Sequence, residues 1–183
     1  ILDKLEAERK VRGYNRNLVV AATGTGKTYL SAFDVREFHP KRMLYVANRD
    51  TILKAARESY QRVLGCDEAE LGLLTGSSKQ HDAKYVFASV DTLRRHMEEW
   101  YEPDDFDYVL IDEAHHSGAN NYRSVIDYFS EAQFFAHQND LDSACRLGIA
   151  GNQQLIADAA FSLAIAALTG GSTGSILHKA HHI

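Results

Sequence analysis

Apolar and polar positions follow two different spacings along the first 130 residues of the chain. Apolar runs with β-branched or aromatic residues predict buried strands at residues 17–22, 42–47, 84–89 and 107–112. Apolar residues at helical spacing predict helices at residues 1–12, 28–38, 50–64 and 90–100. A further apolar run at residues 71–74 is compatible with another strand, but four residues do not settle it.

Residues that start or stop helices support these boundaries. Gly13 closes the first predicted helix, Pro40 follows the second, and Asp50 is the expected N-cap of the third. Strands that alternate with helices at this interval predict an α/β fold, a mostly parallel β-sheet with helices on both faces. A chain of 183 residues is long enough for one such domain with its own core.

The pattern changes after residue 130. No clear strand is predicted within residues 131–152, and residues 153–168 form an apolar helix candidate that ends in the flexible sequence TGGSTGS. We therefore predict a main domain at residues 1–130 and an atypical tail at residues 131–183. The tail either completes the domain or is foreign to it.

Composition predicts a soluble globular protein without a membrane segment. The chain is 45% hydrophobic and 25% charged, and its longest apolar-rich run is shorter than a membrane span and contains Asp158. A net charge of -5 argues against a broad surface for nucleic acid but permits a local basic strip. Two distant cysteines, Cys66 and Cys145, and the lack of a signal-peptide pattern predict a cytoplasmic protein with unpaired thiols.

The sequence AATGTGKT at residues 21–28 matches the phosphate-loop template GxxxxGK[ST], with alanine in place of the first glycine. Gly24 and Gly26 let backbone N–H groups point at phosphate oxygens, and the following helix adds its positive end. Lys27 would supply a charge for the β and γ phosphates, and the Thr28 hydroxyl would reach Mg²⁺. A predicted strand before the loop and a helix after it favour a nucleotide triphosphate site over a simple glycine turn. The expected nucleotide-binding residues are Thr23, Gly24, Thr25, Gly26, Lys27 and Thr28.

Two adjacent carboxylates, Asp112 and Glu113, follow the fourth predicted strand. The carboxyl ends of parallel strands share one edge of the sheet, so these acids should lie near the phosphate loop. We expect Asp112 to hold Mg²⁺ together with Thr28. Glu113 is expected to orient and deprotonate the attacking water, beside phosphates that Lys27 and Mg²⁺ neutralise. The alternative for the two acids is a solvated strand end or helix-capping carboxylates.

Four ordered blocks carry a resemblance to a known family: AATGTGKT, LYVANRDTIL, VFASVDTLRR and VLIDEAHHSGANNYRSVIDYF. In order and interval, over residues 1–130, they resemble the first RecA-like domain of superfamily 2 DEAD/DEAH-box helicases. Within that superfamily the chain is most similar to the restriction-subunit branch, which includes the Res subunit of type III restriction enzymes. The resemblance implies a RecA-like P-loop fold and an ATPase that requires ATP and Mg²⁺.

The resemblance also implies a nucleic-acid partner, with DNA favoured over RNA. The residues that match the strand-binding blocks of the family are Asn48, Arg49, Ser89, Thr92 and Arg94. A few donors of this kind along a sugar-phosphate backbone would let an acidic protein bind a strand. Taken without the family, the arginines would be read as ordinary surface residues.

His115 matches the family histidine that couples the ATP site to a later Ser/Thr-Ala-Thr block, whereas His116 has no assigned role. That block is not clearly present, since LGIAGN at residues 147–152 matches it poorly. The family also has a second RecA-like domain that supplies an arginine finger, in some members a nuclease domain, and an adenine-reading glutamine that would fall before residue 1. An isolated first domain should therefore hydrolyse ATP poorly.

Two alternative functions remain open from the sequence. One is a non-catalytic nucleotide-binding or partner-binding fragment, and the other is an RNA helicase domain that shares the same motifs. The tail after residue 130 could reflect family drift, a fusion, a change of reading frame or a boundary of the expressed piece. His178 and His182 have helical spacing near the chain end but no neighbouring carboxylate or cysteine, so we expect no specific metal site there.

Overall fold

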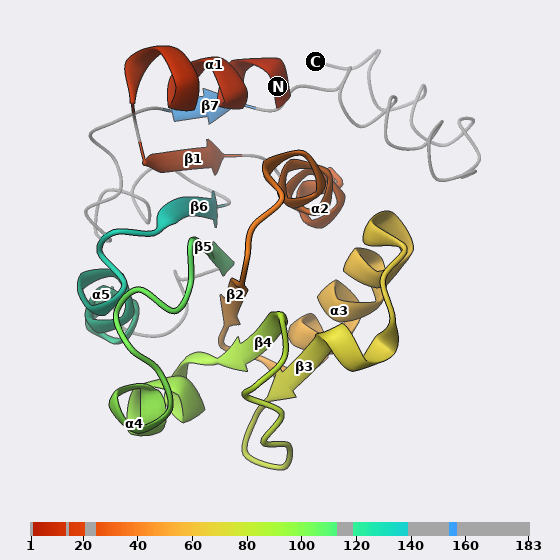
Figure 1. Cartoon of the computed structure of the whole chain (residues 1–183), viewed down its shortest axis with the longest axis vertical. Coiled ribbons are helices and arrows are strands. Elements are labelled where there is room, and N and C mark those ends of the chain that lie inside the picture. Colours follow the sequence, from red (N-terminus) through yellow and green to blue (C-terminus); the bar gives the residue numbers. More distant parts are fainter. Residues whose placement is uncertain (1, 14, 21–24, 113–118, 139–153, 157–183) are drawn as a thin grey trace, which may run out of the picture.

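The structure is a computed structural model that describes residues 2–13, 15–20, 25–112, 119–138 and 154–156. Its strands form one seven-stranded sheet in the order β3-β4-β2-β5-β6-β1-β7, and each pair of neighbouring strands is parallel (Figure 1). The strands are β1 (Arg16–Val20), β2 (Met43–Ala47), β3 (Leu71–Leu74), β4 (Tyr85–Ser89), β5 (Tyr108–Asp112), β6 (Gln133–Gln138) and β7 (Gln154–Ile156). The helices are α1 (Leu2–Arg12), α2 (Lys27–Phe38), α3 (Asp50–Leu64), a 3-10 turn (Glu68–Glu70), α4 (Val90–Trp100) and α5 (Ala119–Tyr128).

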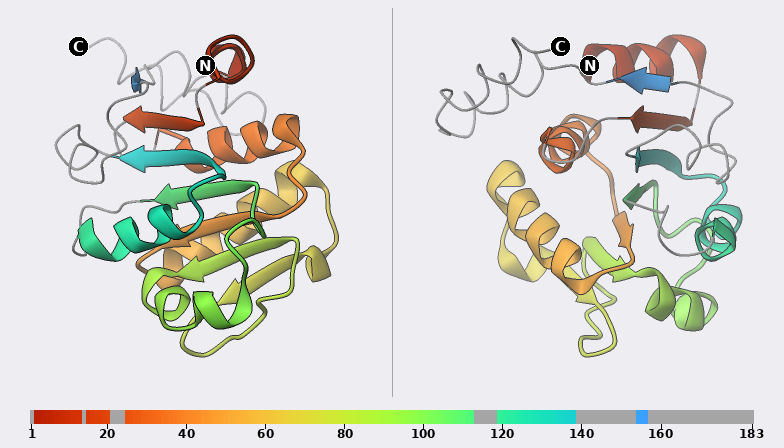
Figure 2. Two further views of the ribbon diagram at one scale, coloured as in Figure 1. Left: turned by 60° about the vertical axis from the view of Figure 1, so that its left-hand side comes forward. Right: turned by 180° about the vertical axis from the view of Figure 1, so that it is seen from behind.

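Helices cover both faces of the sheet. In Figures 1 and 2, α2 and α3 lie on one side of the strands, and α4 and α5 lie on the other. Leu5, Leu30 and Leu53, one from each of the first three helices, are fully buried in a single core with Tyr45 and Leu110 of the central strands. The central strands are therefore covered on both faces, which explains why they appear in the sequence as continuous apolar runs.

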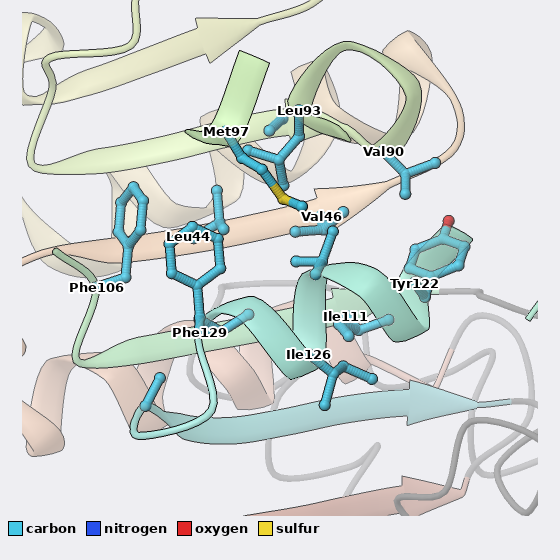
Figure 3. Close-up of a cluster of buried hydrophobic side chains, with 14 of the residues drawn as sticks. Leu44, Val46, Val90, Leu93, Met97, Phe106, Ile111, Tyr122, Ile126 and Phe129 are labelled. Atoms are coloured by element: carbon cyan, nitrogen blue, oxygen red, sulfur yellow. The ribbon is translucent and has the colours of Figure 1, made fainter. Parts of the chain in front are cut away.

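A second core lies beneath α4 and α5 (Figure 3). Leu93 and Met97 of α4 pack with Tyr122 and Ile126 of α5 against the opposite face of β2, where Val46 lies. Full burial of each large apolar side chain contributes roughly 1.5–3 kcal/mol relative to exposure. The two cores together hold the strands in fixed positions. A site built at the carboxyl ends of the strands requires such a support.

The structure confirms every predicted strand and helix of the first 112 residues, with shifts at the ends of the elements. It also confirms the undecided strand, β3, which lies at one edge of the sheet. One detail was wrong: the N-cap of α3 is Arg49, and Asp50 is the first helical residue. A carboxylate in the first turn still interacts favourably with the positive end of the helix, so Asp50 keeps a helix-starting role.

The expectation of no clear strand after residue 130 was wrong at residues 133–138. This segment is β6, and it pairs with both β5 and β1 inside the sheet. Its sequence, QFFAHQ, has an apolar run of only three residues and no alternation, so the pattern was too short to be recognised. Residues 154–156 form β7 rather than the start of the predicted apolar helix. The rest of that helix lies outside the described residues, and the division of the chain at residue 130 stays a prediction.

A buried ion pair fastens α1 to α2. The Arg9 guanidinium donates two hydrogen bonds to the Asp34 carboxylate, and the Tyr108 hydroxyl of β5 donates a third at 2.7 Å. Asp34 is only 2% exposed. The Arg9 guanidinium also lies over the ring of Phe38, 5.3 Å from its centroid. One carboxylate thus joins two helices and a central strand.

We expect Asp34→Asn to lower the free energy of unfolding by about 2 kcal/mol, because charge-assisted hydrogen bonds are lost while Arg9 stays buried. Urea unfolding followed by circular dichroism measures this change. Asp127→Asn is the matched control, since Asp127 pairs with Arg123 on the exposed face of α5 at 3.7 Å. Exposed pairs contribute about 0–1 kcal/mol, so an equal loss in both variants would contradict a special role for the buried pair.

Candidate active site

The described part of the phosphate loop runs from Thr25 to the first turn of α2. Gly26 is the N-cap of α2 and has φ 85° and ψ 21°, a left-handed conformation that glycine adopts without the cost of a Cβ. Its carbonyl accepts the first helical hydrogen bond, from the Leu30 N–H at 3.0 Å. Thr23 and Gly24 lie outside the described residues, so their predicted phosphate contacts stay predictions.

Lys27 and Thr28 occupy the first turn of α2, where the helix carries its partial positive charge. The first turn contains no acidic side chain of its own. Lys27 is only 8% exposed, so its charge lies largely out of water. The helix end and the lysine thus create a positive environment that suits an anionic group.

Asp112 is the last residue of β5. It lies at the carboxyl ends of the strands, where the phosphate loop also lies. Only β6 separates β5 from β1, so the two strand ends are about 10 Å apart at the usual strand spacing. Asp112 is 5% exposed, and its Oδ2 atom accepts a hydrogen bond from the buried Tyr45 hydroxyl. Asp112 follows Leu110, the register partner of Tyr45, by two residues, which places all three side chains on one face of the sheet.

The Tyr45 hydroxyl also links Asp112 to the phosphate-loop helix. Burial raises the pKa of Tyr45 well above its ordinary value, and the charge of Asp112 raises it further, whereas a side-chain hydrogen bond with Thr28 lowers it. The phenol therefore stays protonated at neutral pH and donates to the carboxylate. Thr28 and Asp112, the two predicted metal ligands, thus both interact with one tyrosine hydroxyl.

The donor set suits Mg²⁺ bound together with a nucleotide. Among the described residues, no group of three or more His, Cys, Asp or Glu side chains is placed to hold a metal ion. Mg²⁺ usually takes one or two carboxylates and completes its shell with phosphate oxygens and water. One carboxylate and one hydroxyl beside a phosphate loop match this preference.

Glu113 and His115 lie outside the described residues. Their predicted roles, general base and coupling residue, therefore stay predictions. The backbone that precedes them is described up to Asp112, the last residue of β5. Glu113 is thus bonded directly to a residue at the candidate metal site.

The predicted nucleic-acid residues lie where β2 and β4 end and α3 and α4 begin, the same edge of the sheet. Arg49 and Arg94 are exposed there. Ser89 and Thr92 are buried, and the Ser89 hydroxyl donates to the Thr92 hydroxyl at 2.9 Å. Asn48, which follows β2, is half-buried. Arg49 and Arg94 are thus the more accessible hydrogen-bond donors for a nucleic-acid strand.

Two residues that contact the candidate site residues were not predicted from the sequence. Tyr45 lies within the strand predicted at residues 42–47, and nothing in the sequence marks its hydroxyl as part of a site. Asn121 of α5 accepts a hydrogen bond at 2.7 Å from Arg94 and so orients the predicted strand-binding arginine. Neither contact has a sequence signal, because each depends on how separate elements pack.

The family model described as "Type III restriction enzyme, res subunit" matches residues 1–137 of the chain. The chain belongs to this family. Res-subunit family membership confirms the resemblance to superfamily 2 helicases, a family whose first motor domain binds a nucleotide.

Two curated relatives support the assignment to the Res-subunit family. The chain is 30% identical over 130 residues to the "Type I restriction enzyme EcoAI endonuclease subunit" of Escherichia coli, covering 66% of this chain and 16% of that protein. It is also 30% identical over 128 residues to IRC3 of Saccharomyces cerevisiae, named as a proposed ATP-dependent helicase, covering 64% of this chain and 18% of that protein. The chain spans less than a fifth of either relative's length.

A solved structure supports the RecA-like fold of this Res-subunit family member. The helicase domain of Hef from Pyrococcus furiosus superposes with a TM-score of 0.65 at 18% identity, covering 84% of this chain and 39% of that one. At this identity the likeness supports the fold alone.

Within the described residues, no helix has the length and apolarity needed to cross a bilayer.

Proposed function

We propose that the chain is the first motor domain of a superfamily 2 helicase or translocase, which hydrolyses ATP with Mg²⁺ and couples hydrolysis to DNA binding. The observation that carries this proposal is the Tyr45 hydroxyl, which bonds Asp112 and interacts with Thr28. That contact brings the end of β5 and the first turn of α2 to one point. A phosphate loop and a carboxylate this close favour a nucleotide phosphate site over a structural turn.

The residues divide the chemistry of ATP hydrolysis among them. Lys27 would bind the β and γ phosphates, and Thr28 and Asp112 would hold Mg²⁺. Bound Mg²⁺ would neutralise the charge on the phosphates. Glu113 would align the attacking water and accept its proton. We also propose that Thr23, Gly24, Thr25 and Gly26 donate backbone N–H groups to the phosphates.

The nucleic acid would bind across the same edge of the sheet. Arg49 and Arg94 supply exposed positive charge, with Asn48, Ser89 and Thr92 beside them. A net charge of -5 is compatible with this, because only a few phosphate contacts are needed. We propose DNA rather than RNA because one relative is named as a restriction-enzyme subunit.

Partner domains, a coupling residue and a cellular location also belong to the proposal. A second RecA-like domain would supply an arginine to the nucleotide across the cleft, a nuclease domain would act on the DNA, and His115 would couple hydrolysis to strand movement. We place the protein in the cytoplasm, since Cys66, the cysteine that the structure describes, is a free thiol.

The rate of ATP hydrolysis with DNA, compared with the rate with RNA, tests this function. In protein that also contains the second RecA-like domain, we expect single-stranded DNA to raise the rate of phosphate release at least about 10-fold more than RNA of the same length. A larger response to RNA would replace DNA as the proposed substrate. ATP binding with no hydrolysis under either condition would favour the non-catalytic alternative.

A further inference from the structure

The hydroxyl of Tyr45 occupies an unusual position for a core residue. Tyr45 is fully buried in the middle of a central strand, yet its hydroxyl donates to the carboxylate of Asp112. A phenol ring fills the core as phenylalanine would, so packing alone does not require the hydroxyl. The hydroxyl donates to a charged oxygen, which makes a bond stronger than one between neutral groups.

Neighbouring aromatic rings fix the orientation of Tyr45. Its ring lies 5.7 Å from the ring of Tyr60 on α3 and 5.4 Å from that of Phe87 on β4. Tyr60 is held in turn by its own hydroxyl, which donates to Ser31 at 2.8 Å, and Ser31 donates to the Thr28 carbonyl at 2.9 Å. The ring of Tyr45 is therefore packed between aromatic side chains of α3 and β4, which limits how far its hydroxyl can move.

We propose that Tyr45 is a positioning residue for the metal site, whose hydroxyl holds the Asp112 carboxylate in the orientation that binds Mg²⁺ beside Thr28. This inference rests on the proposed function and extends it to Tyr45, which the sequence did not single out as a site residue. Carboxylates that bind metals are themselves fixed by hydrogen bonds from neighbouring groups. Loss of such a partner typically lowers metal affinity 10–100-fold.

Tyr45→Phe removes the hydroxyl and keeps the ring. With ATP at a saturating concentration, we expect this variant to bind Mn²⁺ about 10-fold or more weakly than wild type. Its affinity for ATP in the presence of EDTA should be unchanged, because the hydroxyl that is removed donates to Asp112, the proposed metal ligand. Mn²⁺ binding is read from the electron paramagnetic resonance signal of the free ion, and ATP binding from isothermal titration calorimetry.

Tyr101→Phe is the matched control. Tyr101 is 3% exposed, and its hydroxyl donates at 2.9 Å to the carbonyl of His81, in the loop before β4. That loop lies at the opposite end of the strands from Asp112. The control should lose about 1 kcal/mol of stability in urea unfolding and keep its Mn²⁺ affinity.

Each outcome decides between the inference and the function on which it rests. Equal Mn²⁺ affinity in wild type and Tyr45→Phe would overturn the positioning role and leave the proposed function standing. Equal weakening in Tyr45→Phe and Tyr101→Phe would also overturn it, since the effect would then follow from stability. A wild-type chain that binds neither ATP nor Mn²⁺ would overturn the proposed function and this inference together.

Discussion

Replacing Lys27 with alanine is expected to weaken ATP binding about 100-fold or more. The ammonium group is buried at the positive end of α2, where it would meet the phosphates away from bulk water. Removal of one partner from a buried charge pair costs about 2–5 kcal/mol, and each 1.4 kcal/mol is a factor of about 10 in affinity. Fluorescence anisotropy of a labelled ATP analogue, titrated with the protein, measures the loss.

Lys41→Ala is the control for Lys27→Ala. Lys41 is exposed in the turn before β2, and its backbone N–H, which alanine retains, donates to Asp107 at 2.9 Å. This variant should bind the analogue as wild type does. If Lys27→Ala retained wild-type affinity while remaining folded, the phosphate-loop assignment would be wrong. Circular dichroism of both variants separates a lost site from a lost fold.

The sequence predicted a helix or strand most clearly where that element is long or is buried on both faces. The strand that ends at Asp112 and the helix over residues 50–64 were recognised because each presents a clear period or a full apolar run. β6 was missed because it contributes only a short apolar run, and its place between β5 and β1 depends on residues far along the chain. Long-range pairing of that kind has no local signal.

The same distinction explains which parts of the site were predicted. Lys27, Thr28 and Asp112 belong to motifs whose spacing is set by the chemistry of phosphate and metal, so the motifs alone were enough to predict them as site residues. Tyr45 and Asn121 act through contacts between elements, with Asp112 and Arg94 respectively. A sequence shows neither the register of β2 on β5 nor the approach of α5 to α4.

Glu113→Gln is expected to lower the rate of ATP hydrolysis about 10²- to 10⁴-fold while ATP binding remains close to that of wild type. A positioned general base contributes a factor of this size, and glutamine retains the shape of glutamate without accepting the proton. Glu113 follows Asp112 directly, and we expect the substitution to leave the proposed metal ligand and its bond to Tyr45 in place. Phosphate release stimulated by DNA should be measured in protein that contains the second RecA-like domain.

Glu98→Gln serves as the control for Glu113→Gln, because Glu98 is an exposed residue of α4 and should leave the rate unchanged. A combined loss of binding and hydrolysis in Glu113→Gln would mean that the carboxylate acts in metal or nucleotide binding. An unchanged rate would mean that another group activates the water. Binding retained with turnover lost separates the catalytic step from the binding step, and it is the result that a division of roles between Asp112 and Glu113 requires.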